Sequence, residues 1–203
     1  MRCVYFPKLK QFLGRNGRII PNINLSTHFT INTSYVLDGE LYDDNLDFNE
    51  IIGITSSDDK EIPKTFKFVV FNALTQEEWD KQESNNTYNF QLLRIKDAVQ
   101  SSINLEMIPC TTANSPEEVM AKHTKYIEEG YEGTMVRGFE SIYQWKRVKL
   151  NEDVLIKIKQ SDKIDAQIIG YYEGENRHTG ALGGFTVKLD DGTEVDVGGF
   201  YSS

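Results

Sequence analysis

The chain has 203 residues, of which 39% are hydrophobic and 11% aromatic, so it can bury a core and is expected to be globular rather than disordered. Its two cysteines, Cys3 and Cys110, lie far apart without a C-x-x-C pair, which argues against a disulfide framework or a zinc site and favours a reducing, cytoplasmic compartment. No apolar run is long enough to cross a membrane, and the net charge of −9 argues against a protein that simply coats nucleic acid.

Strands dominate the predicted elements of the first half of the chain. The runs CVYF, GRII, SYVLDGELYDD and FKFVVFNAL predict strands at 3–6, 17–20, 34–44 and 66–74, since they are rich in β-branched and aromatic residues. A helix in two parts follows, first TQEEWDKQES and then NFQLLRIKDAVQSS, whose apolar residues recur at helical spacing.

A second helix is predicted between Ser115 and Gly130. Ser115 is a suitable N-cap, Pro116 suits the first helical position, and Glu118 completes a capping box. The apolar stripe of this helix includes His123, which we interpret as a packed side chain rather than a metal ligand.

The rest of the chain is again strand-like. EGTMVRGF, QWKRVKLNED and VLIKIKQ predict strands up to residue 160, and the composition changes from about Asp162. From there, short strands are joined by glycine-rich turns, with DDGT as a hairpin signal, which is typical of the beginning of a small antiparallel barrel. We therefore expect an α+β fold with two domains, 1–161 and 162–203.

Basic residues gather in two segments of this acidic chain. Residues 1–30 hold five basic and no acidic side chains, and residues 137–163 hold seven basic and four acidic ones. If the fold brings these segments together, they form one positive cleft on an acidic body. Ordinary scatter over solvated surfaces is the alternative.

Charged residues interrupt two of the predicted strands. In VLDGEL, alternation puts Asp38 and Glu40 on one face and the flanking leucines on the other, and two neighbouring carboxylates repel unless water, a cation or basic groups receive them. In VLIKIK, Lys157 and Lys159 share a face that suits an anion, although alternating lysines also protect an edge strand from aggregation.

Two further stretches are candidates for a binding site. Glu132 lies between two glycines, which either allow a ligand to approach closely or form the turn after a helix. In FKFVVFNAL, Phe66 and Phe68 share one face and Phe71 lies on the other. Most such aromatics belong to a core, but a ring that faces a cleft can stack on a base.

In order and spacing, these motifs resemble those of the ATP-dependent DNA ligases of the covalent nucleotidyltransferase superfamily. MR, GRNGR, LDGEL, FVVFNAL, EGTMVR and LIKIK are similar to the end of K-x-D-G-x-R, an Arg-Gly element, D-G-E, F-x-x-F-D, E-G-x-x-x-K/R and K-x-K. The resemblance spans nearly the whole chain. It implies a nucleotidyltransferase (adenylation) domain of antiparallel sheets with flanking helices, followed by the start of an OB-fold β-barrel.

The resemblance implies a role for each matching residue. Phe71 would stack on adenine, and Arg2 and Arg15 would contact the ribose or the phosphate of the nicked strand. Glu40 would meet the ribose or a metal-bound water. Glu132 would hold Mg²⁺ during catalysis, because hard carboxylate oxygens suit this ion.

The remaining matches carry the implied phosphate chemistry. Lys157 and Lys159 would grip the α-phosphate of ATP and offset the charge that develops as the leaving group departs. Asp38 and Arg137 would support these groups. Asn72 stands where the family often has Asp, so the resemblance assigns it no metal-linked role.

The family reaction joins nicks in duplex DNA with ATP and Mg²⁺. A lysine amine attacks the α-phosphorus of ATP, AMP then moves to the 5′-phosphate at the nick, and the neighbouring 3′-hydroxyl displaces it. No K-x-D-G occurs in these 203 residues, and the barrel segment stops after three predicted strands. We therefore expect a fragment that lacks the nucleophilic lysine and forms no lysyl-AMP by itself, a cytoplasmic monomer whose partner is nicked double-stranded DNA.

Three other interpretations remain open. RNA ligases and mRNA-capping guanylyltransferases belong to the same superfamily and share the carboxylate and K-x-K strands. A non-catalytic module could bind a nucleotide or nicked DNA without chemistry. An unrelated acidic α+β protein could carry the motifs by coincidence.

Overall fold

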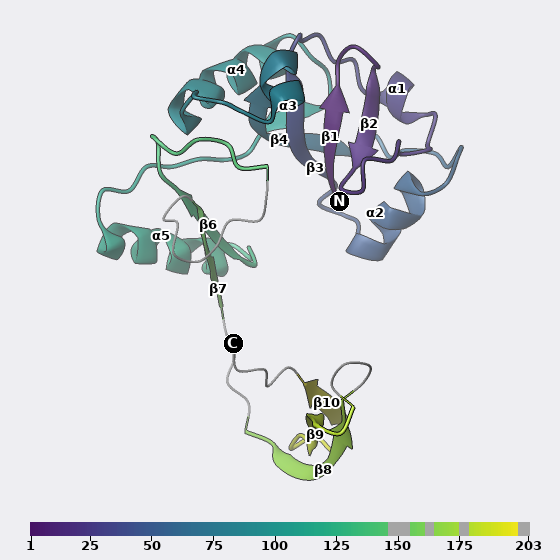
Figure 1. Cartoon of the computed structure of the whole chain (residues 1–203), viewed down its shortest axis with the longest axis vertical. Coiled ribbons are helices and arrows are strands. Elements are labelled where there is room, and N and C mark those ends of the chain that lie inside the picture. The colour runs from purple at the N-terminus through teal and green to yellow at the C-terminus, as the bar shows by residue number, and fades with distance from the viewer. Residues whose placement is uncertain (146–154, 161–164, 175–178, 199–203) are drawn as a thin grey trace. The chain divides into compact units, whose positions relative to one another are not determined.

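The structure, a computed structural model, describes residues 1–145, 155–160, 165–174 and 179–198. It divides the chain into two units, Met1–Ile158 and Lys159–Ser203 (Figure 1). Together the described elements make a mixed fold of sheets with few helices. None of the helices in the described part of the chain is long and apolar enough to span a membrane.

A five-stranded sheet with the order β2-β1-β3-β4-β5 is the centre of the first unit. Its strands are β1 (Arg2–Phe6), β2 (Gln11–Gly14), β3 (Val36–Tyr42), β4 (Lys67–Leu74) and β5 (Leu105–Met107). Neighbouring strands are antiparallel, except that β4 and β5 are parallel.

One face of this sheet is apolar and forms the core. The core cluster takes alternate residues of the three central strands, namely Cys3, Tyr5, Leu37, Leu41, Phe68, Val70 and Ala73. Buried residues of two helices join it, among them Ile51, Ile54, Ile95 and Ala98. The opposite face of the same strands is therefore available to polar side chains.

The helices of the first unit are α1 (Leu25–His28), α2 (Phe48–Thr55), α3 (Gln76–Lys81), α4 (Tyr88–Gln100) and α5 (Pro116–Glu128). Capping boxes begin both α2 and α3, because the N-cap side chain and the glutamate at the third position bond reciprocally to backbone amides. At the start of α5, Ser115 accepts a hydrogen bond from the Glu118 amide, while the Glu118 carboxylate accepts from the Asn114 amide instead.

Several predicted elements are confirmed. The two-part helix is α3 and α4, and the strands predicted at 34–44 and 66–74 are β3 and β4. His123 on α5 is buried, and its Nδ1 lies 3.0 Å from the Thr134 hydroxyl, in keeping with a packed side chain.

Other predicted elements differ. The strand predicted at 17–20 is wrong: Gly17 lies in a turn with φ 73°, and Ile19 forms only an isolated bridge to Leu13 of β2. The strand β2, the short elements α1 and β5 and the helix α2 were not predicted. The strand-like stretch 144–153 falls, from residue 146 on, outside the described residues.

The last described strands form two small sheets. β6 (Gly133–Arg137) pairs with β7 (Leu155–Lys159), and β8 (Gln167–Glu173), β9 (Leu182–Lys188) and β10 (Glu194–Gly198) form an antiparallel sheet in the order β10-β9-β8. The DDGT stretch is the turn between β9 and β10, with Gly192 at φ 87°. These three strands are the ones that the glycine-rich segment predicted.

Candidate nucleotide site

The polar face of the central sheet carries residues from two of the sequence motifs. Arg2 pairs with Glu40, and Val4 pairs with Asp38, in the antiparallel register of β1 and β3. Directly opposed residues share a face, so Arg2, Asp38 and Glu40 all lie opposite the apolar core. The predicted shared face of Asp38 and Glu40 is thus observed.

A β-bulge adds Phe71 and Asn72 to this face. Asp38 pairs with Asn72 and Gly39 pairs with Val70, so Phe71 is an extra residue in β4. A bulge of this kind turns two successive side chains towards the same side of the sheet. Gly39 permits the close packing on the opposite face, since a Cβ there would lie 2.5 Å from the Val69 carbonyl oxygen and 2.7 Å from the Phe68 ring.

Asp38 is the centre of a buried polar cluster on this face. Its side chain is 1% exposed and accepts two hydrogen bonds from Arg2, of 3.1 and 2.8 Å, in the bidentate geometry of a guanidinium and a carboxylate. The Tyr143 hydroxyl donates to Asp38 at 2.9 Å, and the Asn72 amide nitrogen lies at 3.4 Å. We call Arg2, Asp38, Asn72, Arg137 and Tyr143 the Asp38 cluster.

The electrostatics of the cluster follow from burial and pairing. The hydrogen bond to Asp38 raises the pKa of the Arg2 guanidinium, so this group stays charged. Burial, followed by the negative charge of Asp38, raises the pKa of the Tyr143 hydroxyl, which therefore stays protonated and donates. A charged arginine is thus held at a defined position on the sheet face.

Arg2 also lies against Phe71. The Cζ atom of Arg2 is 5.4 Å from the centre of the Phe71 ring, within the range of a cation–π contact. Phe71 is half-buried, whereas Phe66 and Phe68 are fully buried in the core. The predicted division of these three rings between two faces is observed, and Phe71 is the ring that a planar ligand could reach.

Arg137 extends the cluster from β4 to β6. Its Nη1 donates to the Asn72 side-chain carbonyl, its Nε donates to the Ser141 hydroxyl at 3.2 Å, and its Cζ lies 3.9 Å from the centre of the Tyr88 ring. Asn72 therefore bridges Asp38 and Arg137. Residues from β1, β3, β4 and β6, distant in sequence, meet in one network.

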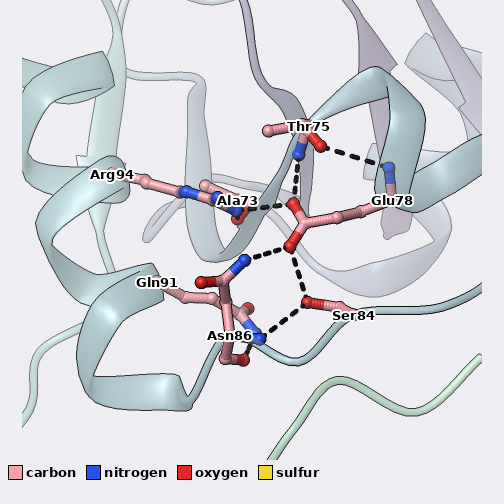
Figure 2. A network of polar contacts seen from close by, with 7 residues as sticks. All are labelled: Ala73, Thr75, Glu78, Ser84, Asn86, Gln91 and Arg94. Carbon is pink, nitrogen blue, oxygen red and sulfur yellow. Dashed lines mark hydrogen bonds and ion pairs between the residues drawn. The ribbon is translucent and has the colours of Figure 1, made fainter.

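Next to the Asp38 cluster, Glu78 on α3 holds together the segment that follows β4, which comprises α3, α4 and the loop between them. Figure 2 shows its carboxylate among donors from two helices and the loop between them: Thr75 N at 2.7 Å, Ser84 Oγ at 2.7 Å, Asn86 Nδ2 at 2.5 Å and Arg94 Nη1 at 2.6 Å. Burial by itself would raise the pKa of Glu78, but these hydrogen bonds outweigh it and lower that pKa to about 2.

Aromatic side chains that were not predicted from the sequence border the Asp38 cluster. Trp79 on α3 packs edge-on against Phe6, with ring centres 5.3 Å apart, and lies 6.4 Å from Tyr143. Tyr143 in turn packs edge-on against Trp145 at 4.8 Å. The available signals were a lone tryptophan in the acidic helix TQEEWDK and two aromatics in the polar stretch SIYQW.

The other predicted site residues lie on the surface of their own elements. Arg15 follows β2, Glu132 precedes β6, and Lys157 and Lys159 lie on β7; all four side chains are exposed. Their meeting with Arg2 and Phe71 stays a prediction.

Glu40 is the remaining candidate metal ligand on the sheet face. Its side chain is half exposed, and its Oε1 lies 3.1 Å from the α-ammonium group of Met1. In the described part of the chain, no group of three or more His, Cys, Asp and Glu side chains could hold a metal ion.

Comparison of the structure with solved structures identifies the fold, whereas comparisons of the sequence find no match. No family model and no curated protein matches the sequence. The structure is similar to that of a Lig E DNA ligase, with a TM-score of 0.77, 19% identity, and 100% of this chain and 75% of that chain covered. The corresponding values are 0.61, 20%, 100% and 76% for the Chlorella virus DNA ligase-adenylate.

The bacteriophage T7 ATP-dependent DNA ligase in complex with ATP is also similar, with a TM-score of 0.56 and 17% identity over 97% of this chain and 71% of that chain. Two further matched chains are longer, and this chain spans 50% of each. The resemblance predicted from motif order thus holds for the three-dimensional structure: the chain has the fold of the ATP-dependent DNA ligases.

Proposed function

We propose that this chain is the nucleotide-binding part of an ATP-dependent DNA ligase, with an adenylation domain over 1–161 and the start of an OB-fold over 162–203. The observation that supports this most directly is the arrangement of Arg2, Asp38 and Phe71. A charged guanidinium, fixed by a buried carboxylate, lies beside a reachable aromatic ring. Adenine nucleotides combine a flat base with anionic phosphates, which is the combination that such a pair can bind.

In this proposal Phe71 stacks on adenine, Glu40 contacts the ribose, and Arg2 contacts the ribose or a phosphate. Lys157 and Lys159 on β7 grip the α-phosphate and offset the charge of the leaving group. Glu132 and Glu40 would hold Mg²⁺ together with phosphate oxygens and water, because this ion commonly binds one or two carboxylates plus substrate phosphates.

The proposed DNA partner is a nicked duplex. Arg15 and Arg2 lie in the segment 1–30, which carries basic and no acidic side chains, and such a segment suits a phosphate backbone even on an acidic protein. The similarity to a Lig E DNA ligase, a protein that binds DNA, supports this partner. We propose that the chain works as a monomer and in the nick-joining steps of replication, repair or recombination.

Nucleotide binding by the intact chain tests the proposal. Calorimetric titration with ATP and GTP in Mg²⁺ should give binding that prefers ATP, and Phe71→Ala should weaken ATP binding by roughly tenfold or more, the value of one base-stacking contact. Phe48→Ala is the matched control, since Phe48 is a phenylalanine on α2 whose side chain is exposed. Equal binding of ATP and GTP, or equal losses in both variants, would contradict an adenine site at Phe71.

A further inference from the structure

Arg137 is a half-buried cation, and no carboxylate in the described part of the chain neutralises it directly. Its described partners are the Asn72 carbonyl, the Ser141 hydroxyl at 3.2 Å and the face of Tyr88 at 3.9 Å, all of them uncharged. The nearest carboxylate in the cluster, Asp38, already accepts hydrogen bonds from Arg2 and Tyr143. A buried charge without a paired counter-charge is costly.

Arg94 is another arginine of this fold, and it has a carboxylate partner. Its Nη1 donates to Glu78 Oε2 at 2.6 Å, and both side chains of this ion pair are about nine-tenths buried. Arg94 also lies over two aromatic rings, those of Tyr35 and Phe90, as Arg137 lies over Tyr88. The two arginines therefore share aromatic packing and differ in the counter-ion.

Arg137 has the neutral side chain of Asn72 in the place where Arg94 has a carboxylate. Its amide nitrogen faces Asp38 at 3.4 Å, and its carbonyl accepts from Arg137, so it joins a carboxylate to a guanidinium without adding charge. The cluster then contains the cations Arg2 and Arg137 and the single anion Asp38. An aspartate at position 72 would neutralise Arg137 and remove this excess positive charge.

We propose that Arg137, with its charge left uncompensated by Asn72, binds the phosphate monoester group of a ligand. The ester comes either from the nucleotide bound at Phe71 or from the 5′-phosphate end of DNA, and both offer oxygen acceptors that suit a guanidinium. The identity of these ligands rests on the proposed function, whereas phosphate binding at Arg137 does not. Burial lowers the pKa of the Arg137 guanidinium, which an incoming anion would reverse.

Inorganic phosphate is the direct probe. We would follow the arginine side-chain resonances of the ¹⁵N-labelled full chain during a phosphate titration, with the Arg137 signal assigned by Arg137→Lys. The Arg137 signal should shift in the wild type, and Asn72→Asp should weaken the apparent phosphate affinity at least tenfold. Asn89→Asp introduces the same charge at an exposed position of α4 and should behave like the wild type.

Arg137→Gln has no Arg137 signal, so the side-chain amide signal of Asn72, which contacts Arg137, is followed as well: phosphate should shift it in the wild type and not in Arg137→Gln. Far-ultraviolet circular dichroism of each variant should match the wild type. No shift of the Arg137 signal with phosphate, or an equal response in wild type and Asn72→Asp, would overturn the proposal. If Asn72→Asp fails to fold, Arg137→Gln decides alone.

The source of the phosphate is tested with paired ligands. If the phosphate of the nucleotide occupies the site at Arg137, AMP should bind at least tenfold more tightly than adenosine. If the phosphate at the DNA end occupies it, a nicked duplex with a 5′-phosphate should bind at least tenfold more tightly than one with a 5′-hydroxyl. In either case the difference in affinity should vanish in Asn72→Asp. If adenosine leaves the Phe71 resonances unchanged while phosphate still shifts Arg137, the nucleotide function fails and the phosphate subsite stands.

Discussion

The Glu78 carboxylate should make the stability of the protein depend on acid pH in a measurable way. Its pKa is about 2 in the folded chain against an ordinary value of 4.5, so its ionised form stabilises the fold by about 3 kcal/mol at neutral pH. Because the folded-state pKa is depressed, this stabilisation is complete above about pH 5 and is lost as the pH falls from the unfolded pKa towards the folded one. About 2 kcal/mol of it should be lost between pH 7 and pH 3.

Urea denaturation of the wild type and Glu78→Gln at pH 7, 5, 4 and 3 measures this directly. At pH 7 the glutamine variant should be about 3 kcal/mol less stable, because an uncharged amide leaves Arg94 without its counter-ion and cannot accept from all four donors. At pH 3 the difference between the two proteins should fall to about 1 kcal/mol. Other carboxyl groups titrate equally in both proteins, so the change in the difference isolates Glu78.

Glu77→Gln on the same helix is the matched control. Glu77 pairs with Lys81 across one helical turn, but its side chain is 75% exposed, and exposed pairs of this kind contribute at most about 1 kcal/mol. Its effect on stability should therefore be small at every pH. Parallel loss of stability in the wild type and Glu78→Gln between pH 7 and pH 3 would refute the argument, since it would mean that the network does not depress the pKa of Glu78.

Two further predictions concern packing and chemistry. Gly39→Ala should destabilise the chain by roughly 3 kcal/mol or prevent its folding, because the added methyl group would lie 2.5 Å from the Val69 carbonyl oxygen. The control is Gly53→Ala on α2, where the nearest atom to the added methyl group would lie at 3.6 Å. In urea denaturation this control variant should be as stable as the wild type or more stable by up to about 1 kcal/mol. Incubation with ATP and Mg²⁺ followed by intact mass measurement should show no added AMP, because these 203 residues contain no K-x-D-G motif; a stable adduct would point to another lysine as nucleophile.

Local periodicity was sufficient to predict part of the site. Alternation along VLDGEL puts Asp38 and Glu40 on one face, and the register of β3 against β1 and β4 agrees. Capping signals likewise located α5 within a residue or two. Both rules hold because they concern neighbours in sequence, whose relative directions the backbone geometry determines.

Contacts between segments that are distant in sequence could not be predicted from these local patterns. Strict alternation puts Phe71 and Asn72 on opposite faces, and only the bulge in the pairing with β3 brings them to the same one. Tyr143 meets Asp38 across 105 positions of sequence, which no local pattern encodes. The strand predicted at 17–20 failed for a related reason, since a left-handed glycine turn outweighed the apolar character of its residues.

Asn72 shows how a departure from a motif acquires a physical meaning in the fold. In the sequence, Asn72 stands where the motif that it resembles often has Asp, and this difference indicates only that a metal-linked role is absent. In the structure it lies between a carboxylate and a guanidinium, and an amide is the side chain that can donate to the first and accept from the second. A carboxylate at this position would repel Asp38 while it neutralised Arg137. An amide at position 72 therefore leaves the cluster with one more positive charge than a carboxylate would, which is why the ligand that we propose for Arg137 is an anion.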